Sequence, residues 1–108
     1  MIERVLEALE NKDYKSFSRC FSEFGRYFDY GPSVNGKENY FCYGRDFIEM
    51  FFKNRFVQDH IRIDCTKKES ETRGSYFAAY DGPYVYVRFE IEELDEDGLI
   101  KKAVVHPA

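Results

Sequence analysis

The chain of 108 residues has the size of one domain, so we expect a single domain over residues 1–108. Its formal net charge of −4 provides no basic surface for a phosphate backbone, which argues against a nucleic-acid partner. Aromatic residues make up 19% of the chain, more than a core of this size needs, so we expect some of them to line a cavity or an interface.

Helical spacing of apolar residues predicts two helices at the start of the chain. The first ends at Asn11, and Asp13 is the predicted N-cap of the second helix, which Gly25 stops. The apolar faces are expected to carry Ile2, Val5, Leu6 and Leu9 in the first helix and Tyr14, Phe17, Phe21 and Phe24 in the second.

The rest of the chain predicts one more helix and a series of strands. A short strand is expected over residues 26–30, a loop over residues 31–39, and a third helix from about Gly44 to Asn54. From residue 57 onward, apolar and polar residues alternate with a period of two, which is typical of half-buried strands. Helices early and strands late favour an α+β fold with a largely antiparallel sheet. The four later strands are expected over residues 57–65, 74–80, 84–92 and 99–106, with a hairpin turn at residues 95–98.

Targeting and cofactor motifs are missing from the sequence. The first residues contain no basic run followed by an apolar segment, and no apolar run approaches the length of a membrane span. The three cysteines, Cys20, Cys42 and Cys65, are odd in number and widely spaced, as expected for reduced thiols. No CxxC pair, phosphate-binding glycine loop or Ser–His–Asp pattern occurs. We therefore expect a cytoplasmic protein with no cofactor, no metal site and no membrane contact.

Four segments carry a resemblance to the nuclear transport factor 2-like superfamily, which includes SnoaL-like and ketosteroid-isomerase-like domains. They are Ala8–Tyr14 between the first two helices, Tyr27–Pro32 at the first strand and its exit, Tyr43–Ile48 at the start of the third helix, and Asp97–Lys101 at the last hairpin. The resemblance covers nearly the whole chain and implies a cone-shaped α+β fold, with three N-terminal helices packed on a strongly bent, mostly antiparallel sheet. It also implies a pocket open at one end of the cone and a homodimer built on the outer sheet face. Members range from isomerases and dehydratases to binding and assembly modules, so the fold does not decide the function.

Two carboxylates become candidate catalytic residues through this resemblance. Ketosteroid isomerases of this fold use one carboxylate as general base and a tyrosine with a protonated carboxylic acid as oxyanion hole. In this chain Asp29 falls at the position of the base and Glu90 near that of the acid, whereas the tyrosine position falls on Val5. A carboxylate buried among aromatics would have a raised pKa and could act as an acid or base. The structural alternative is that Asp29 binds loop amides and that Glu90 pairs with a neighbouring strand at the surface.

His60 is the third candidate for acid–base chemistry. On its predicted strand it shares a face with Arg62 and Asp64, and it lies roughly 13 Å from Asp64, too far for a direct hydrogen bond or a shared metal ion. If this face points into the cone, His60 could serve in the pocket. If it points outward, all three side chains are solvent or interface groups.

Aromatic residues near the predicted pocket are candidates for binding a small apolar or aromatic molecule. The alternative is that they cap the core beneath the loop. The candidates are Tyr14, Phe17, Tyr27, Tyr30, Tyr43, Phe47 and Phe51.

The sequence leaves three functions open: a small-molecule-binding domain, an interaction module whose cone is filled by its own side chains, and a cofactor-independent isomerase or lyase. A cavity of less than a few hundred Å³ would favour the interaction module. We expect a homodimer, because three short helices cover only one face of a sheet and leave apolar area for a second subunit. The residues expected in this contact are Val85, Val87, Phe89, Ile91 and Val104.

Overall fold

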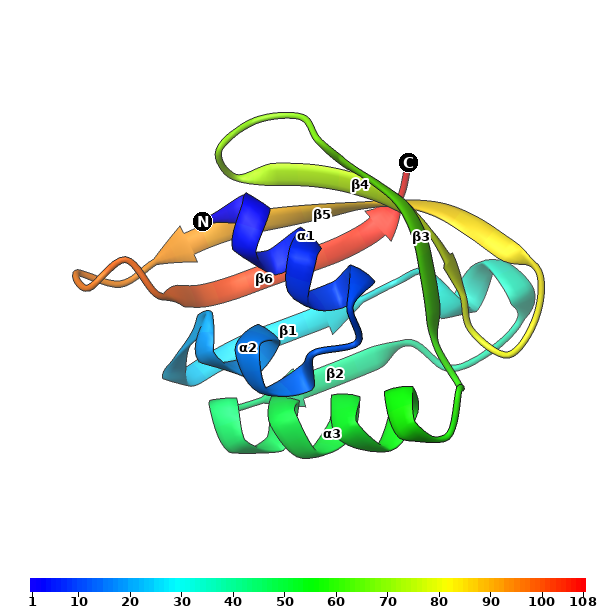
Figure 1. Cartoon of the computed structure of the whole chain (residues 1–108), viewed down its shortest axis with the longest axis horizontal. Helices are drawn as coiled ribbons and strands as arrows, with labels where there is room; N and C mark the ends of the chain where they lie inside the picture. Colours follow the sequence, from blue (N-terminus) through cyan, green and yellow to red (C-terminus); the bar gives the residue numbers. More distant parts are fainter.

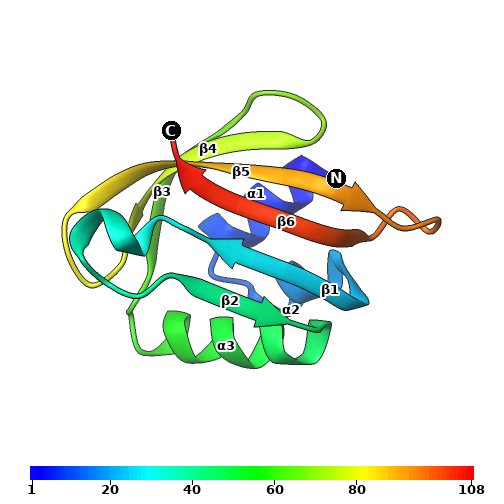
Figure 2. The ribbon, with the colours of Figure 1, turned by 180° about the vertical axis from the view of Figure 1, so that it is seen from behind.

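The computed structural model describes residues 1–108 and consists of one six-stranded sheet with three α-helices. Figure 1 shows the first two helices in front of the sheet and the third along one sheet edge, and Figure 2, seen from behind, shows the strands in front of the first two helices. The helices therefore cover one face, called the inner face, and leave the outer face without an α-helix. This two-layer α+β arrangement agrees with the sequence prediction. No helix in it has the length and apolarity that a membrane crossing requires.

Two strands separate the third helix from the first two in the first half of the chain. Helices α1 (Ile2–Glu10) and α2 (Tyr14–Arg19) come first, whereas α3 (Arg45–Val57) follows two strands, so the three helices are not consecutive at the N-terminus. The 3-10 helix η1 spans Pro32–Asn35. The strands are β1 (Phe21–Asp29), β2 (Tyr40–Tyr43), β3 (Arg62–Lys68), β4 (Arg73–Ala79), β5 (Tyr84–Leu94) and β6 (Ile100–Pro107).

The strand order β2-β1-β6-β5-β4-β3 places β6 and β5 at the centre of the sheet. All neighbouring pairs are antiparallel except β1 and β6, which run parallel. The last four strands form a continuous series of antiparallel neighbours, and the parallel contact joins this series to the β1–β2 pair (Figure 2). The end of β1 therefore lies beside the end of β6, although most of the chain separates them in sequence.

The second helix is shorter than its apolar spacing predicted. Asp13 caps α2 as expected, since its carboxylate accepts a hydrogen bond from the Ser16 amide at 3.0 Å. The helix nevertheless ends at Arg19, and Phe21 already belongs to β1. The helical prediction for Phe21 and Phe24 is wrong because β1 is irregular at its start, so its apolar residues lack the period of two.

Gly25 serves the sheet and does not stop a helix. The pairing of β1 with β6 shifts its register between Phe21 and Arg26, and Gly25 lies within this irregular stretch. A Cβ atom at Gly25 would lie 2.7 Å from the carbonyl oxygen of Ile100, a distance that the backbone cannot accept without moving. Glycine is therefore required at this position for β1 and β6 to approach each other.

The boundaries on both sides of α3 also differ from the prediction. Tyr40–Tyr43, to which no element was assigned, forms the edge strand β2. Helix α3 continues to Val57, where a strand was predicted, because Phe52 and Phe56 extend its buried face by another turn. Strand β3 begins only at Arg62.

The apolar face of β5 packs against the helices within one protomer. Its residues are buried with those of α1 and α2 in a single core cluster, so the prediction that they contact a second subunit is wrong. The outer face carries the alternate residues of the same strand. The inward-facing residues of β5 are Val85, Val87, Phe89 and Ile91, and the outward-facing ones are Tyr84, Tyr86, Arg88 and Glu90.

Candidate functional site

The last residue of β1, Asp29, is the most unusual ionisable group of the protein. Its side chain is only 1% exposed and lies on the inner face of the sheet. The Tyr27 hydroxyl donates a hydrogen bond to the carboxylate at 2.9 Å, the Tyr80 hydroxyl donates at 2.8 Å, and the Gly31 amide donates at 2.9 Å. Residues from β1, from the loop that follows it and from the end of β4 therefore meet at one buried carboxylate.

The pKa of Asp29 reflects a competition between burial and hydrogen bonding. Burial disfavours the ionised form, while the bonds from Gly31, Tyr80 and Tyr27 favour it, and the net result is a pKa raised to about 6. Burial, together with the nearby negative charge of Asp29, also raises the pKa values of Tyr27 and Tyr80, so both phenols keep their protons. At neutral pH the site is an ionised carboxylate held by two phenol donors.

The space beneath Asp29 is filled by aromatic side chains. Phe17 of α2 lies at the centre of this group, with its ring 4.6 Å from that of Phe52 and 5.8 Å from that of Tyr27. None of the five main pockets of the molecule is lined by Asp29, Tyr27 or Tyr80. The carboxylate could act as a base of moderate strength, but none of these five pockets reaches it.

A stack of three side chains covers the same region from the side of α3 and β2. The Tyr40 ring lies 5.6 Å from the Tyr80 ring and 4.9 Å from the Phe51 ring. The Arg55 guanidinium lies over both, 4.4 Å from the centre of Phe51 and 5.4 Å from that of Tyr40. Access to Asp29 from this side therefore requires Tyr40, Phe51 and Arg55 to move.

Glu90 lies on the opposite face of the sheet from Asp29. Its carboxylate accepts from Arg73 Nε at 3.0 Å and lies 3.0 Å from His106 Nε2, so it bridges the neighbouring strands β4 and β6. This is the surface pairing that the sequence offered as the structural alternative. The structure does not bring the two candidate carboxylates together.

His60 lies in the link between α3 and β3, not on a strand. Its Nδ1 atom is 3.0 Å from the Asp81 carboxylate and its Nε2 atom is 3.2 Å from the Gln58 side chain. The neighbouring Arg62 pairs with Asp59, not with His60. His60 thus holds two surface turns together and is separate from Asp29.

The seven predicted ligand-binding residues are divided among three regions. Phe17 and Tyr27 are buried in the core, and Tyr14 packs against it. Phe47 and Phe51 lie on α3. Tyr30 and Tyr43 belong to the outer face, where Tyr43 is 67% exposed. The structure does not gather these residues around one cavity.

The outer face carries an unusual number of exposed aromatic rings. One group lies on β1 and β2, where the Phe41 ring contacts Phe28 at 5.7 Å and Tyr30 at 5.8 Å. A second group lies on β4 and β5, where the Phe77 and Tyr86 rings are 4.9 Å apart. The outer-face aromatics are Phe28, Tyr30, Phe41 and Tyr43 in the first group and Phe77, Tyr84 and Tyr86 in the second.

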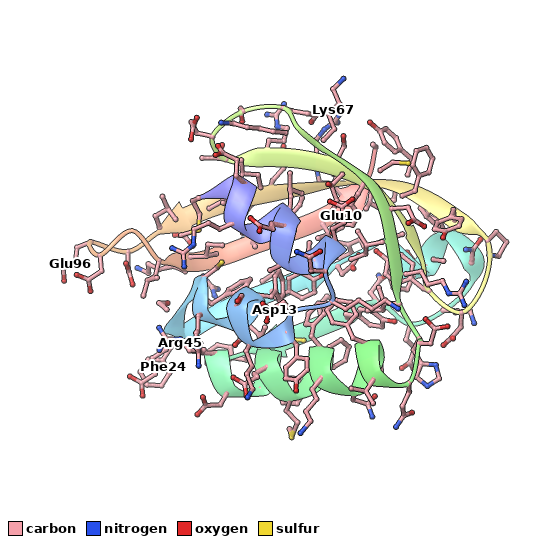
Figure 3. The ribbon with its side chains drawn as sticks, in the orientation of Figure 1. Glu10, Asp13, Phe24, Arg45, Lys67 and Glu96 are labelled. Carbon is pink, nitrogen blue, oxygen red and sulfur yellow. The ribbon has the colours of Figure 1, made fainter.

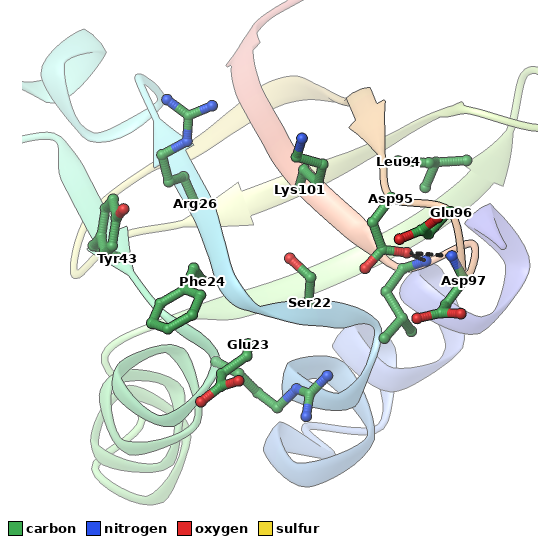
Figure 4. A pocket seen from close by; sticks show the side chains of 12 residues that line it. Ser22, Glu23, Phe24, Arg26, Tyr43, Leu94, Asp95, Glu96, Asp97 and Lys101 are labelled. Atoms are coloured by element: carbon green, nitrogen blue, oxygen red, sulfur yellow. Dashed lines mark hydrogen bonds between the residues drawn. The ribbon is translucent and has the colours of Figure 1, made fainter.

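An open groove of about 830 Å³ lies at the end of the molecule where Figure 3 labels Phe24 and Arg45 on one side and Glu96 on the other. In Figure 4, aromatic rings form one side of the groove and the β5–β6 hairpin forms the other. The acidic residue Asp95 is already used by the hairpin, since it accepts from the amides of Asp97 and Leu99. The groove mixes acidic, basic and apolar groups. Its lining residues are Ser22, Glu23, Phe24, Arg26, Tyr43, Arg45, Leu94, Asp95, Glu96, Asp97, Leu99 and Lys101.

Sequence reasoning missed the partners that define the Asp29 site. Tyr80 lies 51 residues from Asp29 and meets it only through the pairing of the sheet. The sequence did contain one signal for Tyr80. It ends a predicted strand directly before the Asp81-Gly82-Pro83 turn, and the ends of two strands in one sheet can lie close together. Arg55 was not predicted either, because the helix was expected to stop at Asn54. No group of three His, Cys, Asp or Glu side chains is placed to hold a metal ion.

Comparison with known proteins identifies the fold. No protein-family model and no curated protein matches the chain. Solved structures do match. A SnoaL-like protein of unknown function from Burkholderia thailandensis has a TM-score of 0.56 at 14% identity, over 98% of this chain and 89% of that one. An NTF2-like protein of unknown function from Cytophaga hutchinsonii has a TM-score of 0.64 at 11% identity, over 99% and 86%.

A third structure carries a small molecule. It is a hypothetical protein from Catenulispora acidiphila with a ketosteroid isomerase-like fold, in complex with trimethylamine, and it matches with a TM-score of 0.63 at 12% identity, over 99% of this chain and 84% of that one. Identities this low establish the fold and not the function. Because the three matches include nearly every residue of the chain, the protein has the nuclear transport factor 2-like fold.

Proposed function

We propose that the protein is a homodimeric interaction module, which binds a second copy through the outer sheet face and fills its cone-shaped interior with its own side chains. The observation that carries this proposal is the set of exposed aromatic rings on the outer face. Phe41 is 58% exposed and Tyr43 is 67% exposed, although each could have been a polar residue at no cost to the core. Aromatic side chains of this kind are enriched in protein interfaces.

The closed interior supports the same function. Asp29 and its phenol partners are buried and line no main pocket, so none of the main pockets would place a substrate beside the carboxylate. A pocket for a small molecule usually has a volume of several hundred Å³ and is largely preformed. The filled interior therefore favours assembly over catalysis.

The outer face also has a suitable size and charge for a dimer. The six strands, which lie about 4.8 Å apart and rise about 3.3 Å per residue, give the outer face a plane area of roughly 700 Å², close to the roughly 800 Å² that each partner buries in a standard interface. Its central charges are already paired within one copy: Arg73 with Glu90, and Arg88 with Glu69. A second copy can therefore cover these four side chains without leaving any of them unpaired.

Light scattering on two matched variants tests the proposal. Phe41→Glu places a carboxylate in the proposed interface, and Val57→Glu makes the same charge change on α3, where Val57 is 71% exposed. We expect the wild type and Val57→Glu to be dimers at micromolar concentration. We expect Phe41→Glu to be a folded monomer, because an unpaired charge opposes association.

Two results would contradict the proposal. If Phe41→Glu dimerises as well as Val57→Glu, the aromatic groups of the outer face do not form the interface. A monomeric wild type would reject the homodimer itself. Circular dichroism of both variants shows whether each one is folded, so that loss of the dimer is not confused with unfolding.

Binding of a small apolar or aromatic molecule in the cone is the second candidate, favoured by the raised pKa of Asp29 among phenol groups. A ligand would have to displace the stack of Tyr40, Phe51 and Arg55. In that case Phe51→Ala should bind an apolar probe dye that the wild type excludes, and Asp29→Asn in the same background should change its affinity. Equal exclusion of the dye by all three proteins would reject a pocket at this place.

A further inference from the structure

The centre of the outer face contains a histidine placed between two hydrogen-bond acceptors. His106 on β6 has its Nε2 atom 3.0 Å from the Glu90 carboxylate and its Nδ1 atom 3.1 Å from the Pro107 carbonyl oxygen. A neutral imidazole carries one N–H and can donate to only one of these acceptors, whereas the protonated ring donates to both. The surroundings of His106 in a single copy therefore accommodate the imidazolium ion.

The ionic groups around His106 are balanced when its ring is neutral. The three cations Arg73, Arg88 and Lys102 each have one carboxylate partner, at 2.7 to 3.2 Å. Protonation of His106 adds a positive charge with no further carboxylate, since Glu90 already pairs with Arg73. The strands beside β6 carry the charged or titratable outer-face residues closest to His106, and their cations are paired within the copy. These residues are Arg26 of β1, which pairs with Glu93, Tyr30 after β1, and Arg88, Glu90 and Glu92 of β5, which pair with Glu69, Arg73 and Lys102.

Position makes this charge important for the proposed dimer. His106 and Glu90 lie on β6 and β5, the two central strands of the sheet. In a two-fold interface between two equal faces, residues near the centre meet their own copies. Two protonated His106 rings would thus be brought together, out of water, with one uncompensated positive charge on each copy.

We infer that His106 makes the dimer pH-sensitive: the neutral ring permits association of the outer faces, and protonation of the ring weakens it. This inference rests on the proposed function, since it concerns regulation of the same face. Association is therefore compared at neutral and at mildly acidic pH, the range in which histidine side chains serve as charge switches. The two histidines of a dimer can together raise the dissociation constant by up to about 100-fold per pH unit.

Sedimentation velocity at about pH 7.5 and about pH 5.5 measures this effect. We expect the dissociation constant of the wild type to rise by at least about tenfold at the lower pH. We expect His106→Gln to have nearly the same constant at both values, because its amide can still donate to Glu90 but cannot become charged. Asp29 also titrates in this range, but it remains in the variant, so any effect of Asp29 would persist there.

The remaining outcomes distinguish a failure of the homodimer from a failure of the His106 switch. A wild type that is monomeric at both pH values rejects the homodimer and with it the switch. A dimer with a constant affinity, or a His106→Gln variant that weakens with pH as much as the wild type, rejects the switch alone. If neither His106→Gln nor His106→Phe dimerises at the higher pH, His106 has a packing role in the interface, and the switch is likewise overturned.

Discussion

At the scale of single residues, Asp29 combines features that rarely occur together: burial, an ionised form at neutral pH and two phenol donors. Burial alone would raise its pKa much further, and the three hydrogen bonds limit the rise to about 6. The carboxylate holds the exit of β1 to the end of β4, because Tyr80, the residue directly after β4, donates to it. Its role in this structure is thus to join two parts of the sheet.

Asp29 gives the folding stability a characteristic pH dependence. Its pKa rises from 3.8 to about 6 on folding, so the folded state binds the proton more tightly than the unfolded state. The resulting stabilisation is fully present below about pH 4 and is lost as the pH rises through about 6. We predict that the wild type loses about 2 kcal/mol more than Asp29→Asn between about pH 4 and pH 7.

Urea unfolding of both proteins at several pH values checks this prediction. The comparison between the two proteins is needed because exposed carboxylates, such as Asp59 with a pKa lowered to about 2, change stability in the opposite direction. These groups are present in both proteins, so their effects cancel in the difference. Parallel curves for the two proteins would show that the pKa of Asp29 does not rise on folding.

Only part of the Asp29 site could be predicted from the sequence. The resemblance named Asp29 as a candidate base, a role that stays a prediction, and its bond to the Gly31 amide matches the loop-amide alternative. Tyr27 was named as a pocket residue and turned out to be a donor. Tyr80 and Arg55 could not be found, since their contacts arise only when strands and helix distant in sequence come together.

At the scale of elements, the strands with regular alternation were predicted well and the irregular ones were not. β5 alternates between buried inner residues and more exposed outer ones, and both β4 and β5 were located to within about two residues at each end. The start of β1 has a register shift, which breaks the period of two and imitates a helix. The four-residue strand β2 is too short to show a period and is defined only by its pairing with β1.

The irregular start of β1 depends on Gly25, and this can be tested. A methyl group at Gly25 would lie 2.7 Å from the Ile100 carbonyl oxygen, so β1 and β6 would have to separate locally. We predict that Gly25→Ala destabilises the protein by about 1–3 kcal/mol. Thermal or urea unfolding provides the measurement.

Gly82→Ala is the matched control for this substitution. The nearest atom to a Cβ at Gly82 is Asn35 Nδ2 at 3.8 Å, an ordinary contact distance, and Gly82 is not among the glycines with a positive φ. Its substitution should change the stability by no more than about 0.5 kcal/mol. Equal effects of the two substitutions would mean that close approach to β6 is not the reason for glycine at position 25.

At the scale of the whole molecule, the helices close the interior, and the outer face presents the surface proposed for association. The helices bury the inner face and fill the interior, which leaves no main pocket next to Asp29. The outer face keeps two groups of exposed aromatic rings with paired charges between them, and aromatic residues are enriched in protein interfaces. The sequence predicted a homodimer on this side of the sheet, but from the wrong residues of β5. A period of two identifies the two faces of a strand and does not say which one the helices cover.

Small-angle X-ray scattering of the wild type at neutral pH tests the central claim most directly, because it reports both the mass and the arrangement of the copies. One copy has a radius of gyration of 12.4 Å and is 22 Å thick along its shortest axis, which in Figure 1 is the viewing direction, across the sheet and its helices. Two copies stacked face to face along this axis give a radius of about 17 Å and twice the monomer mass. A monomer mass, or a dimer radius near 23 Å from copies joined along the 38 Å axis, would contradict an interface on the outer sheet face.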